Sequence, residues 1–227
     1  MMKKSKVELW SGFNLSRSLF TVPHMVDYDS YIVRKLQHLL KGKQKAVEYG
    51  AGDGIWLEYL AKNNPDREFV GVEWNERAYN YCVDVRGVGL KNLSFIQADM
   101  SEPEGVIECD LCWSFGGIEH FSTPWTVLSA WVKALSPDGL CFLTAPNLLN
   151  RRRVQNRFGF SPEQYLGKDR MVTERKIDYG YSEIWSPNYM TKFVMDSGLE
   201  VLEVGEISCL EEEKPRYIIG LRRADKL

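Results

Sequence analysis

The stretch that decides the fold is Val47-Glu48-Tyr49-Gly50-Ala51-Gly52-Asp53-Gly54, in which a carboxylate precedes three alternating glycines. An apolar run typical of a buried strand leads into this stretch, and an amphipathic segment typical of a helix follows it. Glycines at such a turn let the backbone take tight conformations and let a ligand approach without interference from Cβ atoms. The stretch therefore predicts a ligand site where a strand ends and a helix begins.

The spacing of the glycines separates several classes of nucleotide site. A dinucleotide fingerprint, Gly-x-Gly-x-x-Gly, would place a glycine three residues after Gly52, where Ile55 stands. A phosphate-binding P-loop would need a lysine directly after the last glycine, and none is there. The pattern that remains is acid-x-Gly-x-Gly-x-Gly, in which Glu48 supplies the carboxylate.

Two further carboxylates follow the next two strand-like runs. Glu73 ends the second run, where it is placed to accept hydrogen bonds from a ribose diol, and its neighbour Trp74 is suited to packing on a purine. Asp99, with Met100 beside it, follows the third run, where a carboxylate can accept an adenine amino proton. Since ligands of open α/β sheets bind outside the carboxyl ends of the strands, three acids at this edge predict a single site.

Short apolar runs alternate with amphipathic ones along the chain from residue 46, which predicts βαβ units and a mostly parallel sheet. This alternation stops after Pro146 for about forty residues, and a predicted helix and a hairpin of two strands follow. The expected strands are residues 46–49, 68–73, 93–97, 110–115, 140–145, 200–207 and 216–222. The expected helices are residues 31–40, 55–62, 76–85, 124–135 and 188–197.

Composition excludes several classes of protein. The chain has 227 residues, with 29 basic against 31 acidic side chains, so its net charge is −2. No apolar run approaches the roughly 18 residues that span a bilayer, and we expect a cytosolic (cytoplasmic) protein without a membrane segment. The five cysteines are an odd, scattered set and not a disulfide framework. Cys109 and Cys112 have CxxC spacing within an apolar run, and we expect core packing there and no metal site.

With these residues on one predicted edge, the sequence resembles the class I S-adenosylmethionine-dependent methyltransferases. It is most similar to the small-molecule, methyltransferase type 11/12-like group, which carries Glu-His after the fourth strand, here Glu119-His120. The resemblance covers residues 46–145, and the helix and hairpin after residue 186 match the rest of that family's sheet. It implies an α/β fold, namely a Rossmann-like three-layer sandwich with a seven-stranded, mostly parallel sheet whose last strand is antiparallel. It also implies S-adenosylmethionine as the cofactor.

The resemblance also assigns roles to the residues of the strand ends. The turn from Glu48 to Gly54 would hold the methionine part of the cofactor, and Glu73 would bind the ribose hydroxyls. The remaining positions would flank the adenine or line the end that donates the methyl group. The implied cofactor-binding residues are Glu48, Gly50, Ala51, Gly52, Gly54, Glu73, Trp74, Asp99, Met100, Ser114, Phe115 and Gly116.

His120 is the candidate base for the methyl transfer. It follows the fourth strand, in Gly116-Gly117-Ile118-Glu119-His120-Phe121, where the chain points toward the transferred methyl. Two interpretations stay open, because the imidazole either takes a proton from the acceptor or only shapes the pocket. If His120 is not the base, Glu119, Tyr181 and Glu183 are the next candidates.

The insertion at residues 147–185 is where we expect substrate specificity, since loops at the carboxyl edge of such a sheet carry it. Between Arg151 and Lys176 it has eight basic residues against three acidic ones. This excess fits either a solvated loop or a cationic rim for a carboxylate, a phosphate or a nucleotide-linked substrate. Interleaved aromatic residues keep RNA as an alternative. The balanced total charge disfavours RNA, so nucleic acid is not the expected partner.

These observations favour methyl transfer to the oxygen or nitrogen of a small molecule, with an anionic acceptor compatible with the insertion. A methyltransferase acting on RNA or protein, and a non-catalytic cofactor-binding regulator or partner subunit, are the alternatives. The chain is expected to be one domain, residues 1–227. Its parts are an N-terminal cap or lid at 1–45, a cofactor-binding core at 46–146, the insertion at 147–185 and a C-terminal helix and hairpin at 186–227.

Overall fold

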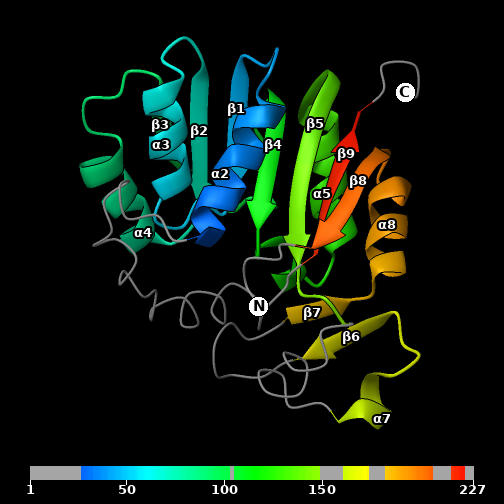
Figure 1. Ribbon diagram of the computed structural model, residues 1–227. Coiled ribbons are helices and arrows are strands. Elements are labelled where there is room, and N and C mark those ends of the chain that lie inside the picture. Colours follow the sequence, from blue (N-terminus) through cyan, green and yellow to red (C-terminus); the bar gives the residue numbers. More distant parts are fainter. Residues whose placement is uncertain (1–26, 103–104, 149–160, 174–181, 207–215, 223–227) are drawn as a thin grey trace.

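The computed structural model describes residues 27–102, 105–148, 161–173, 182–206 and 216–222 (Figure 1). Within these residues nine strands form two sheets, one of seven strands and one of two. The strands are β1 (Lys45–Tyr49), β2 (Glu68–Glu73), β3 (Leu93–Gln97), β4 (Cys109–Phe115), β5 (Leu135–Ala145), β6 (Arg170–Thr173), β7 (Ser182–Trp185), β8 (Glu200–Glu206) and β9 (Arg216–Leu221).

The larger sheet has the strand order β3-β2-β1-β4-β5-β9-β8. The strands β3, β2, β1, β4 and β5 pair in parallel, whereas β9 runs antiparallel to both of its neighbours, β5 and β8. Strand order changes direction between β1 and β4, which is the place where ligands bind in open α/β sheets. The expectation of a Rossmann-like α/β fold with a parallel central sheet is confirmed.

Helices cover both faces of the large sheet and make it the middle of three layers (Figure 1). The helices α5 and α8 pack on one face, and α2 and α3 pack on the other. Side chains along β4 alternate between these layers, with Cys112 on the first face and Trp113 on the second. The described helices are α2 (Asp27–Leu39), α3 (Ile55–Asn63), α4 (Glu76–Tyr81), the π-helix η3 (Cys82–Arg86), the 3₁₀ helix η5 (Ile118–His120), α5 (Pro124–Ala134), α7 (Pro162–Tyr165) and α8 (Pro187–Asp196).

The small sheet is an addition that was not expected, because the seven strands predicted from the sequence all lie in the larger sheet. The strands β6 and β7 pair antiparallel within the insertion that the sequence left without regular structure. Each strand has four residues, and Glu183, the second residue of β7, is fully buried. A buried carboxylate conflicts with the apolar alternation by which strands are predicted, so the pattern was missed.

Several element boundaries differ from the expected ones, and the end of α4 and the start of β5 differ because the local structure changes there. The helix expected over 76–85 ends as an α-helix at Tyr81 and continues as a π-helix, in which the Gly87 N–H donates to the Cys82 carbonyl at 2.8 Å. Strand β5 begins at Leu135, which pairs with Cys109, and residues 136–139 then leave the ladder as a bulge before Leu140. The expected turn is therefore real, but it interrupts a strand that has already begun.

Several expectations concern residues outside the described ranges. The first 26 residues of the expected lid belong there, and so does Tyr181, one of the alternative bases. Most of the charged part of the insertion, including Arg151, Arg152, Arg153, Arg157, Glu174, Arg175 and Lys176, also lies outside them. Among the helices that are described, none has the length and apolarity needed to cross a membrane.

Candidate cofactor site

The glycine turn between β1 and α3 needs its glycines for conformational reasons. Gly50, Gly52 and Gly54 have φ values of +76°, +60° and +68°, in the left-handed region that residues with side chains rarely adopt. The N–H groups of Gly50 and Ala51 both donate to the Val72 carbonyl, at 2.9 and 3.1 Å. These bonds join the end of β1 to the end of β2, so the turn is held at a fixed place on the sheet edge.

Glu73 fixes the same turn from the end of β2. One carboxylate oxygen, Oε2, accepts the Gly52 N–H at 2.8 Å, and the other, Oε1, accepts the Asn75 N–H at 2.8 Å. The residue is 5% exposed, and this burial raises the pKa of its carboxyl group, although the backbone donors act in the opposite direction. An ionised carboxylate can accept about four hydrogen bonds in all, so the backbone donors at Gly52, Trp74 and Asn75 leave acceptor capacity for a ligand. Trp74 follows directly and is half-buried.

Glu48 lies one residue before the end of β1, in the middle of the sheet. It pairs in register with Gly71 of β2 and Trp113 of β4, and only 1% of it is exposed. Burying a charged group without compensation costs free energy, so a carboxylate is expected at this position only where it has a specific structural or ligand-binding role. The structure therefore places Glu48 and Glu73 at neighbouring strand ends, as the sequence predicted.

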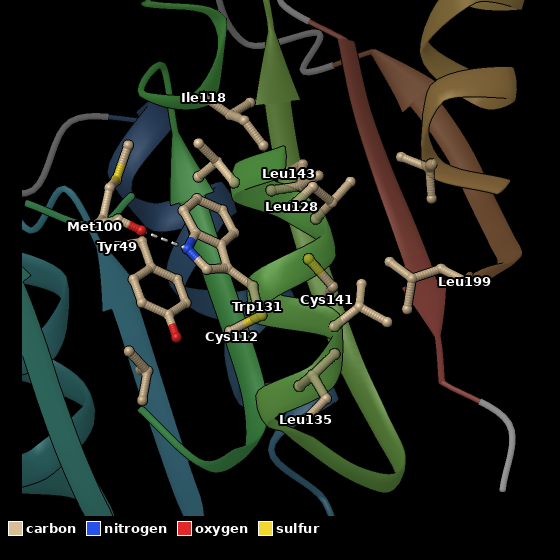
Figure 2. Close-up of a cluster of buried hydrophobic side chains, with 14 of the residues drawn as sticks. Tyr49, Met100, Cys112, Ile118, Leu128, Trp131, Leu135, Cys141, Leu143 and Leu199 are labelled. Atoms are coloured by element: carbon tan, nitrogen blue, oxygen red, sulfur yellow. Dashed lines mark hydrogen bonds between the residues drawn. The ribbon is translucent and has the colours of Figure 1, made fainter. Parts of the chain in front are cut away.

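The segment that follows β3 is hydrogen-bonded to helix α5. The Asp99 Oδ1 accepts the Ser101 N–H at 2.9 Å and the Ser101 hydroxyl at 2.6 Å. The Trp131 Nε1–H donates to the Met100 carbonyl at 2.9 Å, and the Trp131 ring stacks on Tyr49 with 4.1 Å between centroids (Figure 2). Helix α5 thus holds both the β1 exit and the β3 exit.

Met100 lies between two glycine turns. A Cβ atom placed on Gly50 would lie 3.7 Å from the Met100 Sδ, and one placed on Gly117 would lie 3.1 Å from its Cε. The Gly117 position would also bring a Cβ within 2.7 Å of the Ser114 Oγ, a contact that real Cβ atoms essentially never make. A glycine at position 117 therefore leaves room for the Ser114 hydroxyl of β4 and, less strictly, for the end of the Met100 side chain.

The β4 exit divides the candidate residues between two faces of the sheet. Ser114 is fully buried, and its Oγ has no hydrogen-bond partner among the described residues. Gly116 follows with a φ of +70°, and its N–H donates to the Thr144 Oγ1 at 3.1 Å. The Phe115 ring instead packs edge-on against Trp56 and Phe142 on the face covered by α2 and α3. Ser114 and Gly116 thus lie together at the end of β4, whereas the Phe115 ring points to the sheet face that α2 and α3 cover.

His120 ends the short helix η5, just beyond the β4 exit. It is half-buried, and its N–H donates to the Gly117 carbonyl at 3.1 Å. The preceding Glu119 is 3% exposed, with Oε1 3.7 Å from where a Cβ on Gly116 would lie. Helix η5 packs against strand β7, so His120 stands between the cofactor edge and the small sheet.

The small sheet is attached to the β5 exit by backbone and side-chain bonds that the sequence did not reveal. The Trp185 N–H donates to the Pro146 carbonyl at 3.1 Å, and the Leu148 N–H donates to the Trp185 carbonyl at 2.9 Å. The buried Glu183 accepts the Arg170 Nε–H and the Trp185 Nε1–H, both at 2.7 Å, and a second Arg170 nitrogen also contacts it. Glu183 is thus engaged by the Arg170 guanidinium, which joins β6 to β7, and by the Trp185 indole. Figure 1 shows β6 and β7 beneath the end of β5.

Comparisons with known proteins agree with this geometry. A family model described as a methyltransferase domain matches residues 47–141, from β1 into β5. The 1,6-didemethyltoxoflavin-N1-methyltransferase of Burkholderia thailandensis, solved with S-adenosylhomocysteine, superposes with a TM-score of 0.68 over 97% of this chain and 89% of that one, at 10% identity. An S-adenosylmethionine-dependent methyltransferase from Mesorhizobium loti gives a TM-score of 0.68 over 89% of this chain and 100% of that one, at 15% identity.

Residues 47–141 therefore match the methyltransferase-domain family, as the sequence indicated, and the fold is that of solved S-adenosylmethionine-dependent methyltransferases. Among curated relatives, the tRNA (guanine-N(7)-)-methyltransferase of Mycoplasma mobile is 26% identical over 139 residues. That match covers 54% of this chain and 66% of the relative, just under two thirds of its length.

These relatives correct one expectation. Nucleic acid was not the expected partner, because the total charge of the chain is balanced. That inference was wrong, because curated relatives from Mycoplasma mobile and Streptococcus pneumoniae are tRNA methyltransferases. Net charge averages over the whole chain, whereas a nucleic-acid surface depends on where the charges lie.

Proposed function

We propose that the whole chain catalyses methyl transfer from S-adenosylmethionine to the oxygen or nitrogen of an acceptor molecule. The observation that carries this proposal is the meeting of the glycine turn with Glu73 and Asp99 at the exits of three adjacent strands. The fixed backbone of the turn and the acceptor capacity left on Glu73 support it. The buried Ser114 hydroxyl, which has no partner within the described residues, fits a ligand at the same edge.

The proposed cofactor contacts come from the family resemblance, and the places of these residues at the sheet edge are compatible with them. The turn from Glu48 through Gly50, Ala51, Gly52 and Gly54 would face the methionine part, and Glu73 would accept from the ribose diol. Trp74, Asp99 and Met100 would surround the adenine. Ser114, the Phe115 backbone and Gly116 would line the end where the methyl is presented.

The bound cofactor supplies an electrophilic methyl group on a sulfonium, so the protein's contribution is mainly to orient the acceptor in line with it. The acceptor atom forms a bond to the methyl carbon as the carbon–sulfur bond breaks, and the electron pair of that bond stays on sulfur. A hydroxyl or ammonium acceptor must also lose a proton, and His120 is the proposed base that takes it. His120 is suited to this by its place on η5, between the cofactor edge and the small sheet.

A small molecule is the first acceptor class that we propose. The region beside His120 is flanked by the β6–β7 sheet, which is attached to the β5 exit through Trp185 and Pro146. A wall of this kind narrows the space that is open to an acceptor, and small acceptors are enclosed more fully than polymers. Fold neighbours that act on small molecules include the didemethyltoxoflavin enzyme.

A base in RNA is the second acceptor class, and a different observation favours it. The curated relatives are tRNA methyltransferases, and the insertion combines basic and aromatic residues. The two classes predict different labelled products, so one experiment separates them.

The test is transfer of a labelled methyl group from S-adenosylmethionine into metabolite, tRNA and protein fractions in parallel. Label in the metabolite fraction supports the first class, and label in tRNA supports the second. The Gly52→Val variant serves as the matched control, because it should label none of them. Binding of S-adenosylhomocysteine without transfer into any fraction would contradict the proposed activity and favour a non-catalytic cofactor-binding protein.

A further inference from the structure

The π-helix η3 lies directly against the glycine turn and donates to two of its carbonyls. The Cys82 Sγ–H donates to the Gly52 carbonyl at 3.3 Å, and the Arg86 Nε–H donates to the Asp53 carbonyl at 3.1 Å. Cys82 and Arg86 are the first and last residues of η3, so one short helix bonds two successive residues of the turn. Neither side chain had a role in the sequence-based interpretation of this helix.

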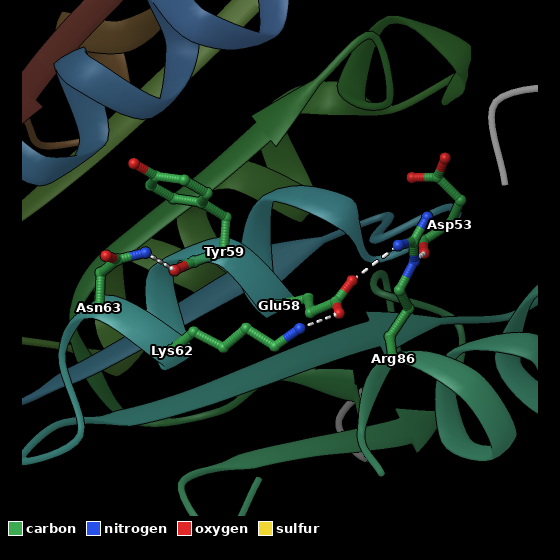
Figure 3. A network of polar contacts seen from close by, with 6 residues as sticks. All are labelled: Asp53, Glu58, Tyr59, Lys62, Asn63 and Arg86. Carbon is green, nitrogen blue, oxygen red and sulfur yellow. Dashed lines mark hydrogen bonds and ion pairs between the residues drawn. The ribbon is translucent and has the colours of Figure 1, made fainter. Parts of the chain in front are cut away.

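Arg86 is itself held in one orientation. It is 4% exposed, its Nη1 lies 2.6 Å from the Glu58 Oε2, and its guanidinium carbon lies 5.4 Å from the centroid of the Tyr81 ring. Lys62 binds the other oxygen of the same Glu58 carboxylate, with 2.5 Å between Nζ and Oε1 (Figure 3). A buried guanidinium with a fixed ion pair is a rigid donor, because its planar fork is already oriented by the carboxylate.

The two sides of the glycine turn are thus bonded in complementary ways. Its N–H groups at Gly50, Ala51 and Gly52 donate hydrogen bonds to acceptors at the end of β2. Its carbonyls at Gly52 and Asp53 accept hydrogen bonds from side chains of η3. Glycines adopt left-handed conformations without steric cost, but they leave them as easily, so a turn with three glycines keeps one conformation only where its neighbours bond it. Gly50, Gly52 and Gly54 are left-handed within five positions, and η3 bonds the carbonyl side of their turn.

We propose that Arg86, assisted by Cys82, is a positioning residue for cofactor binding that holds the glycine turn in its binding conformation through the Asp53 carbonyl. Arg86 acts without touching the cofactor. The proposal rests on the proposed function, in that the turn is taken as the seat of S-adenosylmethionine. π-Helical segments recur at functional sites, which fits an η3 placed against this turn.

Arg86→Lys is the variant that tests this role, and Lys62→Met is its matched control. Lysine keeps a positive charge beside Glu58 but lacks the planar fork that serves Glu58 and the Asp53 carbonyl together. Lys62→Met removes the other cation from the same carboxylate and leaves the bonds of the turn intact. We expect the Kd for S-adenosylhomocysteine, measured by calorimetry, to rise about 5- to 20-fold in Arg86→Lys and to stay unchanged in Lys62→Met. The Cys82→Ala variant should give a smaller rise, because a thiol is a weak donor.

A second measurement is independent of the cofactor. Hydrogen exchange of the Gly54 amide, which donates to the Ala51 carbonyl at 2.9 Å, should become faster in ligand-free Arg86→Lys and not in Lys62→Met. A wild-type protein that binds no S-adenosylhomocysteine would refute the proposed function, while the exchange experiment would still decide whether Arg86 holds the turn. Unchanged affinity and unchanged exchange in Arg86→Lys, with only a lower Tm, would overturn the positioning role.

Discussion

The two halves of the candidate site are built from different kinds of contact. On the cofactor side, formed by the exits of β1 to β4, the turns first of all require glycine, as the positive φ values of Gly50 and Gly52 illustrate, and side chains then hold them in place. On the acceptor side, formed by η5 and the β6–β7 sheet, the structure depends on side chains distant in sequence, such as Arg170 and Glu183. Backbone requirements leave glycines in the sequence, whereas long-range pairs leave no local pattern. The two sides should therefore respond separately to substitution.

His120→Ala should have the largest effect and should act on the acceptor side alone. If His120 takes the acceptor's proton, we expect the rate of methyl transfer to fall roughly 10²- to 10⁴-fold, while affinity for S-adenosylhomocysteine stays unchanged. The measurement is steady-state kinetics with the acceptor found in the labelling screen, and exposed His38→Ala is the control. A rate close to that of the wild type would reject His120 as the base.

Trp131→Ala should damage the cofactor side through the core. The ring is fully buried, stacks on Tyr49 and holds the Met100 carbonyl, so its loss leaves a cavity and an unpaired carbonyl. We expect the free energy of unfolding to fall by about 3–5 kcal/mol, measured by denaturant titration. Trp125→Ala, at a 47% exposed position of the same helix, should cost less than about 1 kcal/mol. Equal losses in the two variants would contradict this account of α5.

Glu73 should make cofactor binding depend on pH. Burial raises the pKa of its carboxyl group, and only the ionised form accepts hydrogen bonds with both oxygens from the turn and the ribose. Affinity should therefore be constant above that pKa and weaken by up to about tenfold per pH unit as the pH falls below it. Titrations of S-adenosylhomocysteine between about pH 5 and about pH 8 measure this. Glu73→Gln should bind weakly throughout and lack this pH dependence; a wild-type profile as flat as the variant's would exclude titration of Glu73 as its cause.

Arg170→Met should give the smallest effect and should act on the acceptor side only. Without Arg170 the buried Glu183 keeps the Trp185 donor, and the small sheet loses part of its attachment. We expect the KM for the acceptor to rise about tenfold with unchanged affinity for S-adenosylhomocysteine. Lys192→Met, which removes an exposed ion pair with Asp196 on α8, should change neither constant. A loss of cofactor affinity in Arg170→Met would show that the two sides are not separable.

The same difference explains what the sequence could predict. The strands at residues 68–73 and 93–97 match β2 and β3 to the residue, because each is an apolar run beside a turn. The positions of Glu48, Glu73 and Asp99 at adjacent strand ends followed from the same pattern. The roles proposed for these residues remain predictions, since they depend on a ligand.

Hydrophobic periodicity along the sequence could not predict other features of the structure. A π-helix has the same local residue preferences as the α-helix that precedes it, so η3 was expected to be α-helical. The contact of Arg86 with the Asp53 carbonyl spans 33 positions and depends on tertiary packing alone. The family resemblance implied a place for Phe115 at the methyl-donating end and did not distinguish its backbone from its ring, which strand alternation turns toward Trp56 and Phe142.

Titration of the protein with S-adenosylhomocysteine by calorimetry tests the central claim most directly. We predict one site with micromolar affinity in the wild type. We also predict a large loss of binding in both Gly52→Val, which forces a branched side chain onto a backbone with φ of +60°, and Glu73→Ala, which removes the acceptor for the Gly52 N–H. Folding of each variant is checked by its circular dichroism. Folded variants that bind as tightly as the wild type would contradict the assignment of the cofactor to this edge of the sheet.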